Sequence, residues 1–311
     1  MPKLFLAAAL AASFGAAVSG QTGSAIPRTP WGHPDLQGRW TNFTLTLVER
    51  PTEFGAKEYF TEAEAAEYLP TAHKRFLAAI TFTDEAALSG EFEPGVWGEE
   101  RGLVPTRRTS LIVGPSGRVP PLTAAAQERA AARAAQRKVR PADGPEDRAL
   151  NERCLWFPVG GPPMLPGIVY NSNYEIVQTP SHVMILAELG NAVRIIPLDG
   201  RPHLPPAIRH WQGDSRGRFE GDILVVETTN FNDKVQFRGA SEHLRLIERF
   251  KRTDRDTIMY EFTASDPTSW TDSWTAEVPM KRLDALLFEY ACHEGNRGLA
   301  NILSGARAVE R

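Results

Sequence analysis

The amino-acid sequence predicts a mainly-β fold, an antiparallel meander that closes into a barrel, with a few helices inserted in the N-terminal half. From residue 170 onward, short runs rich in β-branched and aromatic residues follow one another, and turn residues separate them. The chain also carries 25 glycines and 24 prolines, which indicate many tight connections. A series of hairpins closes most economically into a barrel, because closure removes exposed strand edges.

The N-terminal segment, residues 1–20, predicts a secretory signal peptide. A short basic start ends at Lys3, an apolar run covers residues 4–18, and small residues surround Gly20 where cleavage would occur. The apolar run is shorter than the roughly 20 residues that an uncleaved membrane anchor needs. We therefore expect residues 21–311 to form one periplasmic or secreted domain that does not span a membrane.

Composition excludes some partners and cofactors. The net charge of −3 provides no basic field for nucleic acid. Signatures of phosphate, dinucleotide, zinc-protease and dithiol sites are absent, so no cofactor is expected. None of the seven histidines has a paired spacing typical of metal ligands. A metal site from His203, His293 and a carboxylate would require the fold to bring these distant residues together, so we expect no metal site. The expected partner is a small molecule.

The two cysteines, Cys154 and Cys292, most simply pair in an oxidising compartment. The bridge would close a loop of more than a hundred residues. In the chain-entropy model, such a bridge stabilises the fold by at most ~5 kcal/mol. The alternative is a reactive thiol at Cys292, which lies beside His293.

The N-terminal half mixes strand and helix signals. A strand is expected over residues 41–48 and a hairpin over residues 110–119. Thr61 and Glu64 form a capping-box pattern, which predicts a helical insertion at about 61–80 that is interrupted before Pro70. A second helical insertion, about 123–140, begins at Thr123 and has no apolar stripe beyond alanine. It is interpreted as a solvated spacer, with a partner-binding helix as the alternative.

The C-terminal half predicts nine strands of a meander. They cover residues 174–179, 182–189, 193–198, 216–219, 223–229, 244–252, 257–264, 274–281 and 286–292.

Two resemblances follow from motifs. Gly38-Arg39-Trp40 resembles the Gly-x-Trp opening of lipocalin and calycin barrels, where the tryptophan plugs the barrel base, and it implies a lipocalin-like barrel with insertions. Most of the chain is similar to a set of uncharacterised exported bacterial proteins, a resemblance that implies export and a single fold. Its motifs are QTP at 178–180, DGRPH at 199–203, GDSRGRFEGD at 213–222, where Phe219 replaces the usual tryptophan, DPTSWT at 266–271 and YACHEGN at 290–296.

Four residues are candidates for catalysis. His203 lies between an Asp-Gly turn and prolines, and this rigid backbone would hold an acid/base imidazole in place. The alternative is a structural role, in which His203 forms a hydrogen bond to a neighbouring loop. Glu227 shares a strand face with apolar residues, so it is either a functional carboxylate or one half of an ion pair that braces the barrel. Arg194, Arg245 and Arg249 are its possible partners.

The other two candidates are Glu289 and His293. Alternation along the expected strand 286–292, continued to His293 at its end, places Glu289 and His293 on one face and Tyr290 on the other. If the first face points inward, a carboxylate and an imidazole meet in the barrel. If the second does, Tyr290 lines an apolar pocket and His293 is superficial.

Candidate substrate-binding groups complete the site. Asn171 and Asn173 are either polar pocket groups or turn residues, and Trp270 belongs either to an aromatic wall or to the core. The full set is Asn171, Asn173, Arg194, Arg249, Trp270 and Tyr290.

The sequence therefore predicts an exported barrel that acts on a small organic molecule by cofactor-free acid/base chemistry, as a lyase, isomerase or hydrolase. A histidine would act as base, a carboxylate would orient it, and Arg or Asn would stabilise negative charge. The alternatives are a lipocalin-like carrier of an apolar or aromatic ligand and a structural envelope protein.

Overall fold

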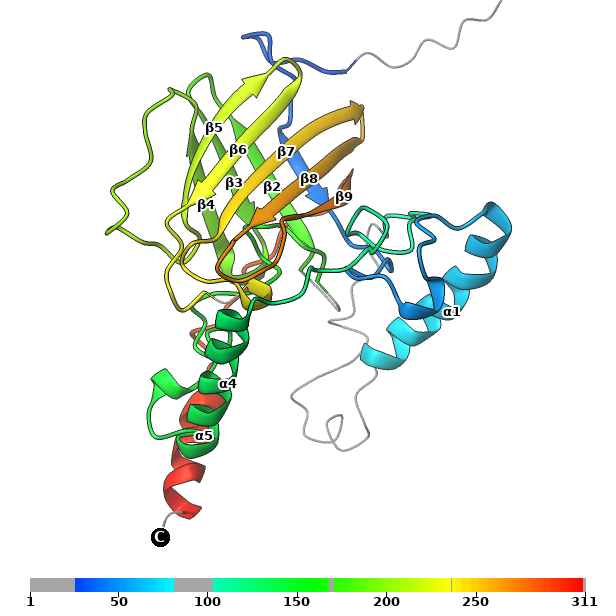
Figure 1. The fold of residues 1–311 in the computed structure, drawn as a ribbon. Helices are drawn as coiled ribbons and strands as arrows, with labels where there is room; N and C mark the ends of the chain where they lie inside the picture. Colours follow the sequence, from blue (N-terminus) through cyan, green and yellow to red (C-terminus); the bar gives the residue numbers. More distant parts are fainter. Residues whose placement is uncertain (1–25, 81–102, 168–170, 236, 310–311) are drawn as a thin grey trace, which may run out of the picture.

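The computed structural model describes residues 26–80, 103–167, 171–235 and 237–309. The predicted signal peptide lies outside these residues. The architecture is a nine-stranded antiparallel barrel that is nearly closed, with helices at its lower end and side (Figure 1). This confirms the mainly-β barrel prediction.

The sheet follows the chain in strand order. Every strand except the pair β4 and β5 is hydrogen-bonded to its neighbours in sequence, and β9 returns to pair with β1, so the barrel is of the up-and-down type. The strands are β1 (Gly38–Thr41), β2 (Asn173–Gln178), β3 (His182–Ala187), β4 (Ala192–Pro197), β5 (Asp214–Glu220), β6 (Ile223–Thr229), β7 (Arg245–Asp254), β8 (Thr257–Ser265) and β9 (Trp274–Arg282).

One junction in the circuit, between β4 and β5, has no backbone ladder among the described strands. The two strands nevertheless lie beside each other (Figure 1). A Cβ atom added at Gly217 of β5 would lie 2.8 Å from the Ile196 Cγ2 atom and 2.8 Å from the Leu198 Cδ2 atom. Side chains from the end of β4 therefore pack directly on the β5 backbone, and we call this junction the seam.

Side-chain alternation fills the barrel interior. Along β8, Ile258, Tyr260, Phe262 and Ala264 point inward and are all fully buried. Their aromatic rings touch those of neighbouring strands, with centroids 4.9 Å apart for Phe250 and Tyr260. The interior is therefore a packed core, and these side chains occupy the space that a ligand chamber would need.

Aromatic contacts continue toward one end of the barrel. The ring centroids of Phe262 and Trp274 are 5.4 Å apart, and those of Trp270 and Trp274 are 5.7 Å apart. Near the other end, Trp40 is fully buried, and its indole Nε1 donates to the Leu36 carbonyl at 3.0 Å. The Arg252 guanidinium carbon lies 5.3 Å from the centroid of the Trp40 ring, which is a cation–π contact.

A chain segment covers the barrel beside Tyr174 and Tyr260. The Met164 amide donates to the Tyr260 hydroxyl at 3.1 Å, and the Tyr174 hydroxyl donates to the Leu165 carbonyl at 3.3 Å. Met164 and Leu165 are both buried. Two inward-facing tyrosines thus hold this segment through their polar ends while their rings pack in the core.

Within the described residues, three α-helices lie outside the barrel: α1 (Glu62–Ile80), α4 (Ala124–Val139) and α5 (Arg297–Val309). The capping box predicted at Thr61 and Glu64 is present, with reciprocal bonds of 2.8 and 3.3 Å. Thr123 caps α4 as predicted, because its hydroxyl accepts from the Ala126 amide at 3.2 Å. Short 3₁₀ turns cover Thr52–Phe54, Pro145–Asp147, Leu189–Asn191 and Phe237–Gly239.

Several predicted element boundaries are wrong in the N-terminal half. Helix α1 continues through Pro70, although proline removes one helical hydrogen bond. Strand β1 covers only Gly38–Thr41, and no hairpin forms at residues 110–119. Residues 111–113 instead extend the edge of β9: the Val113 amide donates to the Thr275 carbonyl at 3.0 Å, and the Glu277 amide donates to Leu111 at 2.9 Å.

The predicted strand over residues 286–292 is also absent, and this segment is irregular. The reason is that β1 and residues 111–113 already occupy the edge of β9 that this segment would need. Its amides bond to side chains instead: Phe288 donates to the Glu188 carboxylate at 2.7 Å, and Tyr290 donates to the Asn191 side chain at 3.1 Å. Helix α5 follows it and was not predicted.

We predict that Gly217→Ala lowers the free energy of unfolding by about 1–3 kcal/mol, the range for overpacking a core. The added methyl group collides with Ile196 and Leu198 across the seam. Urea unfolding measures the change. Gly305→Ala is the control, because a Cβ there meets nothing within 4 Å. If Gly217→Ala is as stable as the wild type, the close packing of Ile196 and Leu198 against Gly217 is contradicted.

Candidate functional site

A polar network lies in the barrel interior beside the seam. The Arg194 guanidinium of β4 binds the Glu248 carboxylate of β7 through two hydrogen bonds, of 3.0 and 2.6 Å. Glu248 is fully buried and Arg194 is nearly so. Arg194 was predicted to bind substrate or to pair with Glu227, but the structure pairs it with Glu248.

Hydroxyl groups connect this ion pair to the strands between its partners. Ser215 of β5 and Thr228 of β6 lie 2.9 Å apart, and both accept from the Arg194 Nη2 atom, at 3.3 and 3.4 Å. The Tyr260 hydroxyl of β8 donates to Glu248 at 2.8 Å. The network therefore links five consecutive strands, β4 to β8, across the junction that has no backbone ladder.

Electrostatics hold this network in one protonation state. Burial alone would lower the pKa of Arg194, but the Glu248 charge and its hydrogen bonds outweigh burial and raise it. Burial, followed by the Glu248 charge, raises the pKa of Tyr260 well above its ordinary value. The stable arrangement is an ion pair between Arg194 and Glu248 beside a neutral Tyr260. Because the surrounding side chains exclude solvent, we assign this network a role in stability and not in catalysis.

A second polar cluster lies on the outer face of β5. The His203 Nδ1 atom lies 2.8 Å from the Asp214 Oδ2 atom, which also accepts from the Leu204 amide at 3.0 Å. The other carboxylate oxygen of Asp214 accepts from Arg216 at 2.6 Å. We call His203, Asp214 and Arg216 the outer-face cluster.

The carboxylate of this cluster is kept ionised. Burial would raise the pKa of Asp214, but hydrogen bonds from the Leu204 amide, His203 and Arg216 together lower it. An ionised Asp214 favours a proton on the His203 Nδ1 atom, which leaves the Nε2 atom as the acceptor. The His203 side chain is 26% exposed, so the ring is within reach of a solute.

The loop that carries His203 is clamped in place. The Asn230 side-chain amide donates to the carbonyls of Leu204, Pro205 and Ile208, at 2.9, 3.2 and 3.1 Å. The Arg216 Nε atom donates to the Pro202 carbonyl at 3.0 Å. The His203 ring is therefore held in one orientation, and its bond to Asp214 also anchors the loop.

Glu227 lies on the same outer face as the cluster. It is opposite Arg216 in the β5–β6 ladder, which brings the two Cβ atoms to neighbouring positions. Its carboxylate bonds to the Arg245 Nε atom at 2.6 Å, and its side chain is partly exposed. The ion pair was predicted as one alternative, but it braces the outside of the barrel and not the interior.

The other two catalytic candidates, Glu289 and His293, are exposed and lie in the irregular segment before α5. Of the two alternatives for this segment, the interior carboxylate–imidazole pair does not form, because no strand is present there to point the two side chains inward. The structure does not bring either residue to the outer-face cluster.

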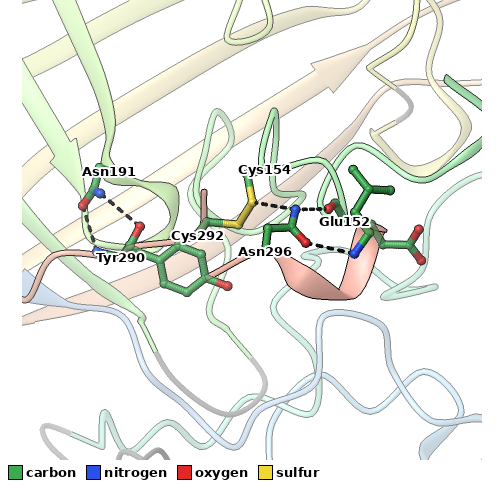
Figure 2. Close-up of a disulfide and its surroundings, with 7 residues drawn as sticks. Glu152, Cys154, Asn191, Tyr290, Cys292 and Asn296 are labelled. Carbon is green, nitrogen blue, oxygen red and sulfur yellow. Dashed lines mark hydrogen bonds between the residues drawn. A yellow bond between two sulfur atoms is a disulfide. The ribbon is translucent and has the colours of Figure 1, made fainter. Parts of the chain in front are cut away.

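The predicted disulfide is confirmed, and it fastens this segment. Cys154 and Cys292 are bonded, with Cα atoms 5.8 Å apart. Figure 2 shows the Asn296 amide beside the bridge, donating to the Glu152 carbonyl at 2.8 Å, while Asn191 exchanges two bonds with the Tyr290 backbone. The bridge therefore holds the C-terminal segment against the loop that precedes β2.

The predicted binding residues scatter over the molecule. Asn173 is buried and donates to Glu188 at 2.6 Å. Asn171 adopts a left-handed backbone conformation, with φ of 57°. The Tyr290 ring packs edge-on against Phe157. Trp270 is core, and Arg249 lies on the outer face near Glu220 and Glu261. The structure does not bring these residues together, and their binding roles stay predictions.

Sequence reasoning missed Asp214 and Glu248. Glu248 alternates with Leu246 and Phe250 in a predicted strand, a pattern that places it on the apolar face. That signal could have identified it. For Asp214, the sequence shows only its position at the start of a strand and gives no sign of its pairing with His203.

No protein-family model, curated protein or solved structure matches this chain. Within the residues that the structure describes, no group of three or more metal-ligating side chains is suited to hold an ion. In the same residues, no helix is both long enough and apolar enough to cross a membrane.

We predict that Arg194→Met and Glu248→Met each destabilise the protein by about 3–5 kcal/mol, because each leaves one charge buried without its partner. The double variant should recover much of that loss, since it leaves no unpaired charge. Urea unfolding of all four proteins gives the coupling free energy. Additive losses would contradict a direct interior ion pair.

We predict that Asp214→Asn costs about 2 kcal/mol at pH 7, through weakened charge-assisted hydrogen bonds. The pKa of Asp214 is lowered by folding, so its contribution is present above the unfolded pKa of about 3.9 and is lost as the pH falls through the folded pKa. Urea unfolding should therefore show the difference between the two proteins shrinking as the pH falls below about 4, the unfolded pKa. Asp233→Asn, at an exposed position, is the control; a pH-independent difference contradicts the assignment.

Proposed function

We propose that the outer-face cluster is a proton-transfer site for a small polar organic molecule, and that the protein is an exported, cofactor-free enzyme of the lyase, isomerase or hydrolase type. The observation that carries the proposal is the 2.8 Å contact between the His203 Nδ1 atom and the buried Asp214 carboxylate. A base oriented by a carboxylate is the arrangement that general acid/base catalysis requires.

Each residue of the cluster has a role in this proposal. Asp214 fixes the tautomer and orientation of His203, whose Nε2 atom takes a proton from the substrate. Arg216 uses its Nε and Nη1 atoms to hold Pro202 and Asp214. Its Nη2 atom is then the donor for negative charge that develops on the substrate. Glu227 is a positioning residue that fixes Arg245 beside the site.

The packed interior favours an outer-face site over a lipocalin-like carrier. A carrier needs an enclosed apolar chamber, and Tyr174, Phe250, Tyr260 and Phe262 occupy that space. The disulfide supports export, because such bridges persist in oxidising compartments.

The test is metabolite profiling of a bacterial periplasmic extract that is incubated with the purified wild-type protein. At least one small molecule should be consumed, and His203→Gln should slow its consumption by about 100-fold or more, the usual contribution of a general base. Asp214→Asn should slow it as well.

The matched control is His243→Gln, which removes an exposed imidazole whose ion-pair contact is with Glu242 and not with a residue of the cluster. It should consume the molecule at the wild-type rate. The proposal is overturned if no molecule is consumed, or if the folded His203→Gln protein, checked by circular dichroism, is as active as the wild type.

A further inference from the structure

A basic groove that shares no lining residue with the outer-face cluster lies between α4 and the loop that precedes the disulfide. Its volume is about 460 Å³, which is within the range of small-molecule sites. Six cationic side chains line it: Arg133, Arg137, Arg140, Arg148, Arg153 and Lys234. The chain as a whole has a net charge of −3, so this concentration of positive charge is local.

Two of the six cations are neutralised by neighbours. Arg140 pairs with Asp143 at 3.0 Å and with Asp147 at 3.6 Å. Arg148 binds Glu152 through two bonds, of 2.8 and 3.1 Å. These pairs fix the wall of the groove and leave little charge for a ligand.

The other four cations, Arg133, Arg137, Arg153 and Lys234, form no ion pair or side-chain hydrogen bond within the described part of the chain. They come from three separate segments. Arg133 and Arg137 are one turn apart on α4, Arg153 precedes the disulfide, and Lys234 follows β6. The lining also holds Glu146, a carboxylate that forms no ion pair among the described residues. Like charges gathered without partners repel one another, and a bound anion removes that repulsion.

The groove is held together by contacts outside it. Thr123 caps α4, and Arg129 of the same helix donates to the Ser269 hydroxyl at 2.9 Å. The disulfide holds Cys154 next to Arg153, and the Lys234 amide bonds to the Asn232 side chain at 3.0 Å. Fixed backbones reduce the ordering that binding would otherwise require.

The lining is apolar where it meets the barrel. Trp156 is buried at 8% exposure, and it lines the groove with the half-buried Leu150. Cationic walls and an apolar base suit a compact molecule that carries several anionic groups around a small carbon or phosphate framework. Arginine forks match phosphate and carboxylate oxygens through paired hydrogen bonds.

We propose that this groove binds a small polyanion, a free molecule with two or more phosphate or carboxylate groups. This inference is independent of the outer-face cluster. It assigns α4 a ligand-binding role in place of the solvated spacer that its sequence predicted.

Isothermal titration calorimetry with tripolyphosphate and with citrate, in low-salt buffer, tests the proposal. At least one probe should bind saturably at one site, and its affinity should fall as KCl is added, because salt screens exposed charges. The tighter probe identifies phosphate or carboxylate as the preferred chemistry. His203→Gln should bind the probe as the wild type does, which separates this result from the proposed enzymatic function.

Adjacent residues on α4 provide a matched pair of variants. Arg137→Gln should weaken binding about threefold or more, and Arg133→Gln/Arg137→Gln about tenfold or more, since each change removes a charge that faces the ligand. Lys138→Gln removes the same charge from the next residue, which does not line the groove, and should leave the affinity nearly unchanged. No saturable binding of either probe, or equal weakening by Lys138→Gln and Arg137→Gln, overturns the proposal.

Discussion

The ion pair between Arg194 and Glu248 is the interaction on which the closed shape of this barrel depends. Eight of the junctions between neighbouring strands are held by backbone ladders. At the seam between β4 and β5, closure depends on packing at Gly217 and on a guanidinium that reaches from β4 to partners on β5, β6 and β7. Burial makes this pair costly to break, because either charge alone would remain in the core.

The packed interior also decides where function can lie. Side chains that would line the chamber of a carrier fill it instead, so groups able to meet a solute lie on the outside of the barrel and beside its helices. The loop that joins β4 to β5 crosses from one side of the seam to the other, and it carries His203 to Asp214 on the outer face. Closure of the seam therefore positions both partners of that contact, which links stability to the proposed chemistry.

Much of the fold could be predicted because alternation and turn residues are local signals. Strands β2 to β9 match predicted runs, and the caps at Thr61 and Thr123 are where the sequence places them. Residues 286–292 also alternate, but a strand needs a free edge, and β1 with residues 111–113 had taken it. The candidate site was harder to predict than the fold. His203 could be identified from its rigid loop. Its partner Asp214 and the pairing of Arg194 with Glu248 could not, because they depend on strand register and on closure of the barrel, which no local sequence pattern contains.

The most direct test of the account is amide hydrogen exchange, strand by strand, in the wild type and in Glu248→Gln. If the buried ion pair closes the seam, the variant should lose protection first and most strongly in β4 and β5, while β8 and β9 keep theirs, because their ladders are intact. Unchanged protection in β4 and β5, or an equal loss in all nine strands, would contradict the claim that this pair holds the barrel closed.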